Sequence, residues 1–322
     1  MDITIVIAIY KPNIKWLCEE LQSISEQTFQ SFSVIAWNDC PSDEFDYNTL
    51  FQKHLGLIPF KIIQGQRNLG SNKVFEKLTQ MVHTPYIAYC DQDDIWLPQK
   101  LGTLIQTIKQ EKVSLVCSDM YIIDGNSNIT AKSITEVRPH HVFYHGNDMF
   151  QHIVTRNFVA GCTVLMETAE AQKAVPFPVN FCHDHWLAIW SALHGGVHIV
   201  QRPLIKYRIY GGNQTSILKN VYDKQSYYHE RIERYQLKIQ ELWRRLKDDM
   251  QMTESIRQNL ITKLQWAEAR KNYFNNRSLQ NFFKLYRFRQ ESFLMTWFEL
   301  LLPMIPNCVF SQIIRNIQKG KI

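Results

Sequence analysis

YIAYCDQDD, residues 86–94, is the stretch that decides the fold. Its apolar first part, Tyr86–Cys90, is typical of a buried strand, and a cluster of acidic residues follows at Asp91–Asp94. Open α/β sheets bind ligands at the carboxyl ends of their strands. Mg²⁺ and Mn²⁺ favour one or two carboxylates together with phosphate oxygens of a substrate. The stretch therefore predicts a divalent cation that holds a diphosphate, and the alternative is an acidic turn before the next helix.

Short apolar runs alternate with helical patterns on both sides of this stretch. Strands alternating with helices indicate an α/β fold with a doubly wound, mostly parallel sheet. Strands are predicted at 3–9, 33–37, 60–64, 86–90, 114–117, 158–166, 197–201 and 204–209, and helices at 13–27, 45–55, 71–82, 98–111 and 186–193.

The composition changes after residue 216. Residues 217–322 hold 19 of the 36 Lys and Arg residues but only 10 of the 30 Asp and Glu residues. We therefore expect a catalytic-type α/β domain at 1–216 and a basic helical region at 217–322. In the second part, an apolar stripe at helical spacing predicts a long amphipathic helix, followed by a helix at 254–275. The stripe consists of Tyr228, Ile232, Tyr235, Ile239, Leu242 and Leu246.

The most apolar segment, Phe293–Phe310, contains Glu299, Pro303 and Pro306. It falls short of the roughly 18 uninterrupted apolar residues of a membrane-spanning helix. Basic residues flank it, so residues 284–322 are predicted either to lie on a membrane surface or oligomer partner, or to dock on the body of the protein. No nucleic-acid-binding motif is present, so we expect no nucleic-acid partner.

The seven cysteines are scattered and include no C-x-x-C pair. This spacing argues against a disulfide framework or a zinc site and favours a reducing compartment. The apolar run Ile3–Ile9 follows Asp2 in place of a basic segment, so we interpret it as a strand and not as a signal peptide. A cytoplasmic location is expected.

Further polar motifs follow other strands. Asp39 follows the second strand, where a carboxylate can accept the imide N–H of uracil or thymine. Arg67, Asn68 and Gly70 follow the third strand. Arg67 could bind phosphate, Asn68 could bind a ribose or a base edge, and Gly70 would let the backbone approach a ligand. Each motif taken alone could equally be an ordinary turn or helix start.

Two motifs lie in the second half of the α/β region. His183-Asp184-His185-Trp186 could supply a general base beside a ring that stacks on a sugar, or an N-cap and a core anchor. In Tyr207–Asn213, Arg208 could neutralise phosphate and the glycine pair could form a mobile loop, or the segment could be a strand and a linker. The histidine group at 140, 141 and 145 is interpreted as a solvated loop and not as a metal site.

The order of these motifs resembles the inverting family 2 glycosyltransferases of the GT-A fold. The resemblance covers roughly residues 1–215, with its most specific parts at 91–101 (DQDDIWLPQKL) and 183–190 (HDHWLAIW), followed by 157–166 (NFVAGCTVLM) and 204–213. Within that family the chain is most similar to bacterial rhamnosyltransferase-like enzymes of surface-polysaccharide synthesis.

The resemblance implies a role for each motif residue. Asp184 would be the catalytic base, and Asp91 and Asp93 would bind Mg²⁺ or Mn²⁺. The implied donor-binding residues are Tyr10, Asp39, Arg67, Asn68, Gly70, Asp91, Gln92, Asp93 and Arg208, and the implied acceptor-binding residues are Gly161, His183, His185 and Trp186.

The implied function is metal-dependent, inverting transfer of one sugar to a hydroxyl of a growing bacterial surface glycan. The resemblance favours rhamnose on a thymidine diphosphate, with a uridine diphosphate hexose as the alternative. The acceptor would be lipid-linked, at the inner face of the cell membrane. Tyr210 stands where the family often has histidine, and the Q-x-x-R-W signature of processive synthases is absent.

The motifs argue against two other functions. A non-catalytic scaffold that binds sugars or nucleotides would not need intact Asp91, Asp93 and Asp184. A sugar-nucleotide pyrophosphorylase would need a basic, glycine-rich loop after the first strand, where Tyr10-Lys11-Pro12 stands instead.

Overall fold

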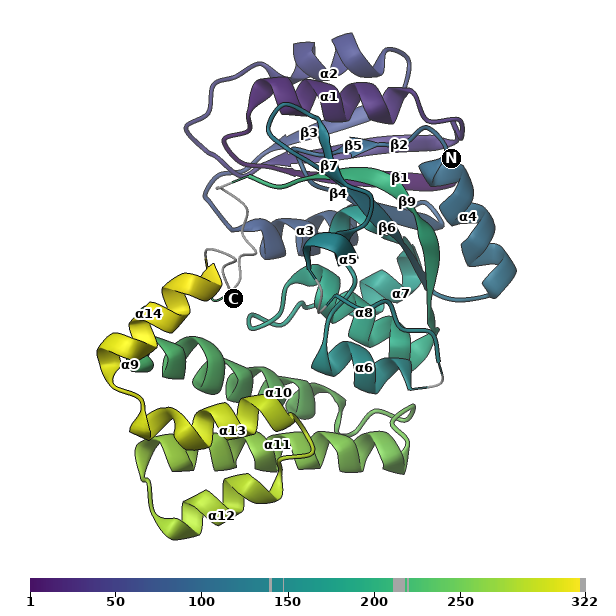
Figure 1. The fold of residues 1–322 in the computed structure, drawn as a ribbon. Coiled ribbons are helices and arrows are strands. Elements are labelled where there is room, and N and C mark those ends of the chain that lie inside the picture. The colour runs from purple at the N-terminus through teal and green to yellow at the C-terminus, as the bar shows by residue number, and fades with distance from the viewer. Residues whose placement is uncertain (139–140, 147, 211–217, 219, 319–322) are drawn as a thin grey trace. The chain divides into compact units, whose positions relative to one another are not determined.

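The computed structural model describes residues 1–138, 141–146, 148–210, 218 and 220–318 (Figure 1). The chain divides into two compact units, Met1–Gly211 and Gly212–Ile322. The change in composition places this division at residue 216, within the segment 211–217 that lies outside the described residues.

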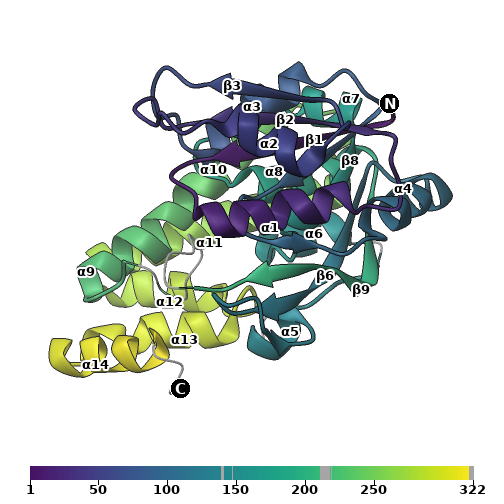
Figure 2. The same ribbon diagram turned by 90° about the horizontal axis from the view of Figure 1, so that it is seen from above.

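The first unit is built on a mixed sheet with the strand order β3-β2-β1-β4-β8-β6-β9-β5, and β7 pairs with β6. The pairs β3–β2, β2–β1, β1–β4 and β6–β9 are parallel, and Figure 2 shows β3, β2 and β1 side by side. The segments that follow β1, β2, β3 and β4 therefore meet at one edge of the sheet. The strands are β1 (Ile3–Ile9), β2 (Phe32–Asn38), β3 (Phe60–Gln64), β4 (Tyr86–Cys90), β5 (Ile95–Trp96), β6 (Leu115–Ile123), β7 (Ile129–Ala131), β8 (Leu165–Glu167) and β9 (Val197–Arg208).

Helices cover both faces of this sheet: α1 and α2 lie together on one face, and α3 lies on the opposite face (Figure 1). Helix α1 begins where the Asn13 side chain accepts hydrogen bonds from two backbone N–H groups, and it buries Leu17, Leu21 and Ile24 at helical spacing. The helices are α1 (Ile14–Ser25), α2 (Tyr47–Leu55), α3 (Ser71–Met81), α4 (Lys100–Glu111), α5 (Ile134–Val137), α6 (Met149–Thr155), α7 (Thr168–Lys173) and α8 (His183–His194), with a 3₁₀ turn at Gly161–Thr163.

The predicted α/β class with a C-terminal helical region is confirmed, and three local expectations are corrected. The strand predicted at 158–166 is mostly absent, because Thr163 donates from its backbone N–H and its hydroxyl to the Ala160 carbonyl and closes a turn. The two strands predicted between 197 and 209 form one strand, β9, whose register against β6 shifts near Asp119. The helix predicted from residue 186 already begins at His183, so Asp184 lies in its first turn.

The second unit consists of helices in the part that the structure describes. They are α9 (Lys224–Tyr227), a π-helical stretch (Tyr228–Glu233), α10 (Arg234–Leu246), α11 (Glu254–Asn275), α12 (Leu279–Arg287), α13 (Phe293–Leu301), a 3₁₀ turn (Leu302–Met304) and α14 (Asn307–Gln318). The predicted apolar stripe faces inward: Ile232, Ile239, Leu242 and Leu246 are buried. Among the described residues, no helix combines the length and the apolar character needed to cross a bilayer.

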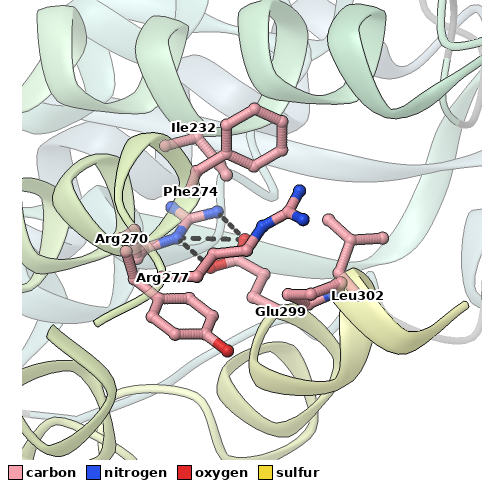
Figure 3. Close-up of a pocket in the computed structure, with 8 residues that line it drawn as sticks. Ile232, Arg270, Phe274, Arg277, Glu299 and Leu302 are labelled. Atoms are coloured by element: carbon pink, nitrogen blue, oxygen red, sulfur yellow. Dashed lines mark hydrogen bonds and ion pairs between the residues drawn. The ribbon is translucent and has the colours of Figure 1, made fainter. Parts of the chain in front are cut away.

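A buried ion pair links α11 to α13 (Figure 3). Arg270 Nη2 donates to Glu299 Oε1 at 2.6 Å, and Arg270 Nε donates to Glu299 Oε2 at 2.9 Å. The Tyr227 hydroxyl also donates to Glu299, and the Arg270 guanidinium lies over the Trp266 ring. Removing one partner of such a pair costs about 3–5 kcal/mol because a buried charge is left alone. The only charged residue of α13 is therefore held on its inner side.

Candidate active site

The acidic residues after β4 lie at the edge of the sheet where the parallel strands end. Asp91 and Asp93 are partly exposed there, whereas Asp94 is buried. Gln92 joins this segment to the end of the neighbouring strand β1. The Tyr10 backbone N–H donates to Gln92 Oε1 at 2.8 Å, and Gln92 Nε2 donates to the Tyr10 carbonyl at 3.1 Å.

Helix α1 adds a further carboxylate beneath this segment. Glu20 is fully buried, and its oxygens have no nitrogen or oxygen partner among the described residues. Burial raises the pKa of Glu20 to about 8, with the Asp93 and Asp91 charges acting in the same direction. Glu20 is therefore protonated near neutral pH, which limits the negative charge in the interior.

Lys100 is the buried cation of the site. It lies at the start of α4, is fully buried, and donates from Nζ to the Cys162 carbonyl at 2.5 Å. Its Nζ also lies 3.1 Å from the centre of the Trp96 ring. Burial lowers the pKa of Lys100 to about 8, and its positive charge opposes part of the rise that burial causes in the pKa of Asp91.

Arg208, at the end of β9, is a second buried cation. Its guanidinium donates to Glu19 Oε2 at 2.7 Å and to the Asp93 carbonyl at 2.7 Å. Its backbone N–H donates to Asp94 Oδ1 at 2.9 Å. The expectation that Arg208 neutralises a phosphate is corrected, because the side chain is fully buried and binds the protein. Arg208 instead holds the 93–94 segment in place.

The remaining charge imbalance makes the site suitable for a cation. Burial, followed by the Asp93 and Asp184 charges, raises the pKa of Asp91 to about 7, and burial also raises the pKa of Asp93 and Asp94. Ligand atoms of Asp91, Asp94 and Cys162 lie within 4.8 Å of one another. Asp94 Oδ2 has no oxygen or nitrogen partner among the described residues. A group of carboxylates that repel each other, with unsatisfied oxygens, fits Mg²⁺ or Mn²⁺.

The first turn of α8 brings Asp184 to this group. Asp184 Oδ2 accepts a hydrogen bond from the Gly161 N–H at 3.3 Å, and Oδ1 accepts one from the His185 N–H at 2.6 Å. A Cβ on Gly161 would lie 2.5 Å from His183 Nε2, so only glycine allows the two segments to approach this closely. The His183 ring itself packs on Phe75 with 4.2 Å between ring centres.

Asp39 organises the segment that follows β3. Its carboxylate accepts hydrogen bonds from the backbone N–H groups of Leu69 and Gly70 at 2.8–3.0 Å. Gly70 has a φ of +79°, a conformation that favours glycine. Arg67 and Asn68 are exposed just before this point. The structure therefore brings Asp39 and the 67–70 segment together, as the strand order predicts.

Tyr210 donates from its hydroxyl to Asp93 Oδ2 at 2.7 Å, and its ring lies 4.7 Å from that of Trp16. The tyrosine that replaces the expected histidine thus contacts one of the two predicted metal ligands. Its hydrogen bond fixes the orientation of the Asp93 carboxylate and stabilises its charged form.

Two predicted acceptor residues point elsewhere. Trp186 is buried, and its Nε1 donates to the Ala174 carbonyl at 2.7 Å, so it is the core anchor that was the alternative interpretation. His185 Nε2 lies 2.9 Å from the Ile153 carbonyl, toward α6. A helix turns successive side chains by about 100°, so neighbours of Asp184 face different directions.

Lys100, Glu20 and Tyr210 were not among the predicted site residues. Lys100 belongs to DQDDIWLPQKL, one of the stretches most similar to family 2 glycosyltransferases, and this similarity could have identified it as a site residue. Glu20 carries no such signal, because a glutamate on an amphipathic helix is usually solvated. The glycine pair at 211–212, Asn213 and His140 lie outside the described residues.

Comparison with known families and relatives gives a consistent picture. Residues 4–171 match the family described as Glycosyl transferase family 2. An uncharacterized glycosyltransferase of Methanocaldococcus jannaschii is 32% identical over 130 residues, which are 39% of this chain and 44% of the relative. The chain therefore spans less than half the length of that relative. The UDP-Glc:α-D-GlcNAc-diphosphoundecaprenol β-1,3-glucosyltransferase of Escherichia coli is 21% identical over 202 residues, 62% of this chain and 73% of the relative.

Among solved structures, S. aureus TarS 1–349 in complex with UDP-GlcNAc aligns with all of this chain and 93% of its own. The TM-score is 0.59 at 13% sequence identity, so the likeness concerns the fold. It agrees with the GT-A fold expected from the sequence.

Gly161→Ala should displace Asp184 without unfolding the protein. The new Cβ would lie 2.5 Å from His183 Nε2, and the His183 ring is already packed against Phe75. A misplacement of about 1 Å at a catalytic group can cost roughly 100-fold in rate. We expect a loss of this size in nucleotide-sugar turnover, mainly in kcat. Gly102→Ala is the matched control, because its Cβ would make only ordinary contacts at 3.7 Å or more. A normal rate in Gly161→Ala would contradict this account of the 161–184 contact.

Tyr210→Phe should weaken Mn²⁺ binding. The hydroxyl orients Asp93, and loss of a hydrogen bond to a metal-ligating carboxylate typically costs about 10–100-fold in metal affinity. The measurement is a Mn²⁺ titration in the presence of UDP, followed by the melting temperature. Tyr222→Phe, at an exposed tyrosine of the second unit, is the control. Equal Mn²⁺ affinity in wild type and Tyr210→Phe would show that the contact has no such role.

Proposed function

The chain belongs to glycosyl transferase family 2, and we propose that it transfers one sugar from a nucleoside diphosphate to a hydroxyl of a growing bacterial surface glycan, with inversion at the anomeric carbon. One observation carries this proposal. The carboxylates at the end of β4 and in the first turn of α8 converge: Asp91 lies within 4.8 Å of Cys162, and Gly161, the neighbour of Cys162, donates to Asp184. The Asp184 charge accordingly raises the pKa of Asp91. A diphosphate site and a general base would then face the same sugar.

In the proposed reaction, Asp184 takes the proton of the acceptor hydroxyl as that oxygen attacks the anomeric carbon. The bond between this carbon and the diphosphate oxygen breaks, and its electron pair leaves with the nucleoside diphosphate. Asp184 is partly exposed and accepts only backbone hydrogen bonds in the contacts above, so its carboxylate can receive a proton.

Asp91 and Asp93 are the proposed ligands of a divalent cation, Mg²⁺ or Mn²⁺. Both are partly exposed, whereas Asp94 is buried beside Arg208 and supports the site from below. When bound, the cation would stabilise the charge that develops on the leaving diphosphate. Since protons compete with a cation for carboxylates of raised pKa, cation binding should strengthen as pH rises through about 7.

The proposed donor pocket lies at the ends of β1, β2 and β3. The half-exposed Tyr10 ring would contact the nucleobase, and Arg67 and Asn68 would contact the nucleoside and its phosphates. Asp39 already holds two backbone N–H groups. A carboxylate can accept about four hydrogen bonds, so Asp39 could still accept the imide N–H of a pyrimidine base.

For the donor, we propose a uridine diphosphate hexose first and thymidine diphosphate rhamnose second. Asp39 could read either base, and the E. coli relative uses a uridine diphosphate sugar by its name. The acceptor named for that relative is linked to diphosphoundecaprenol. We propose a lipid-linked acceptor here too, which would place the enzyme at the inner face of the cell membrane.

A non-catalytic scaffold on the same fold is the second candidate. The melting temperature with UDP, with and without Mn²⁺, separates the two. An enzyme of the proposed type should gain stability from UDP only when Mn²⁺ is present, whereas a scaffold should show no dependence on the metal.

Asp184→Asn and Asp93→Ala should both abolish sugar transfer but should differ in donor binding. Loss of a positioned base typically costs about 10²–10⁴-fold in rate. Asp184→Asn should keep the Mn²⁺-dependent stabilisation by UDP, because the amide still accepts the Gly161 hydrogen bond. Asp93→Ala should lose much of it. Transfer rates and melting temperatures measure the two effects.

Asp148→Asn serves as the control, because this exposed aspartate of the first unit makes no side-chain cap hydrogen bond. It should match the wild type in both measurements. Near-normal transfer by Asp184→Asn would rule out Asp184 as the base.

A further inference from the structure

Helix α13 buries its charged residue and exposes apolar residues. Its only charged residue, Glu299, is buried against Arg270, as Figure 3 shows. On its outer side, Leu294 is 81% exposed and Phe293 is 61% exposed. An amphipathic helix on a water-facing surface has the opposite arrangement, with charges outside.

The exposed apolar residues form one stripe. Leu301 follows Phe293 by eight residues and Leu294 by seven, and Met304 follows Leu301 by three, which places the four residues on one side of α13 and its 3₁₀ extension. Leu301 is 48% exposed and Met304 is 79% exposed. Single exposed leucines are common in soluble proteins, but a continuous apolar patch marks an interaction surface. We call these four residues the α13 face.

Unpaired positive charge accompanies the α13 face. In the described part of 276–318 the acids are Glu291, which pairs with Lys263 at 3.3 Å, and Glu299, which pairs with Arg270. The basic residues of the same segment take part in none of the ion pairs found among the described residues. They are Arg277, Lys284, Arg287, Arg289 and Arg315.

We propose that the α13 face binds the surface of an anionic lipid bilayer, with the basic residues of α12 contacting lipid headgroups. An apolar stripe of Phe and Leu beside lysines and arginines is the composition of helices that lie in the membrane interface. Trp297, partly exposed on the same side, is a residue type enriched at that depth. A protein partner would use the apolar stripe but would not require an excess of positive charge.

Membrane binding rests on the proposed function in one respect: that function explains why binding to a lipid surface would be useful. An enzyme that acts on a lipid-linked glycan gains from staying at the membrane. The binding itself needs neither donor nor cation, so it can be tested separately from catalysis.

The test is co-sedimentation of the full chain with vesicles. We expect binding to phosphatidylcholine vesicles that contain phosphatidylglycerol, weaker binding to pure phosphatidylcholine, and a decrease with added salt. The double variant Phe293→Ser/Leu294→Ser should bind the anionic vesicles at least about tenfold more weakly, because two apolar side chains no longer leave water. Lys284→Gln/Arg287→Gln should lose most of the preference for anionic lipid.

Leu57→Ser is the matched control, since Leu57 is a fully exposed leucine of the first unit. It should bind vesicles like the wild type. All variants should keep the melting temperature and the stabilisation by UDP with Mn²⁺, so a failure of membrane binding is distinguishable from a failure of the proposed function. Failure of the wild-type protein to bind anionic vesicles would overturn the proposal. A dimer in solution that Phe293→Ser/Leu294→Ser dissociates, with vesicle binding unchanged, would also overturn it.

Discussion

The first unit depends on one electrostatic constraint: carboxylates from α1 and from the segment after β4 are packed together at the end of a buried strand. Glu20 and Asp94 are buried, and Asp91 and Asp93 are partly so. Such a group repels itself in a low-dielectric interior. The fold offsets the repulsion with two buried cations, Lys100 and Arg208, and by raising the pKa values of carboxyls such as Glu20 and Asp91, so that some of them hold protons. A site held in this way still favours an additional cation.

The same constraint explains why residues far apart in the chain are joined here. Lys100 binds the Cys162 carbonyl, which places the 161–163 turn; Gly161 in that turn then contacts Asp184. Arg208 holds the 93–94 segment, and Tyr210, two residues later, orients Asp93. Each contact that stabilises the acidic group therefore also positions a residue with a proposed chemical role. In the second unit, α13 also buries a charged residue, which is paired with Arg270, but it leaves apolar side chains exposed.

The sequence predicted the fold class well because β1 to β4 are short, mostly apolar runs that alternate with helical patterns, and this pattern depends on local composition alone. It also placed Asp39 and the 67–70 segment after neighbouring strands, and the structure joins them because parallel strands end at one edge. It could not assign Arg208 or Trp186 correctly, because a residue type does not reveal which way its side chain points. Arg208 is buried by β9, and Trp186 lies a half-turn from Asp184 on α8. The strand predicted at 158–166 is mostly absent because a short hydrogen-bonded turn forms at Gly161–Thr163, despite the apolar composition of the segment.

A crystal structure of the protein with UDP and Mn²⁺, with diffraction data collected at the manganese absorption edge, would test whether the acidic group binds a cation and the diphosphate. We expect an anomalous peak within coordination distance of the Asp91 and Asp93 carboxylates and of the diphosphate, with Lys100 and Arg208 still buried. A bound UDP whose diphosphate lies away from these residues, with no anomalous peak beside Asp91, would contradict this expectation.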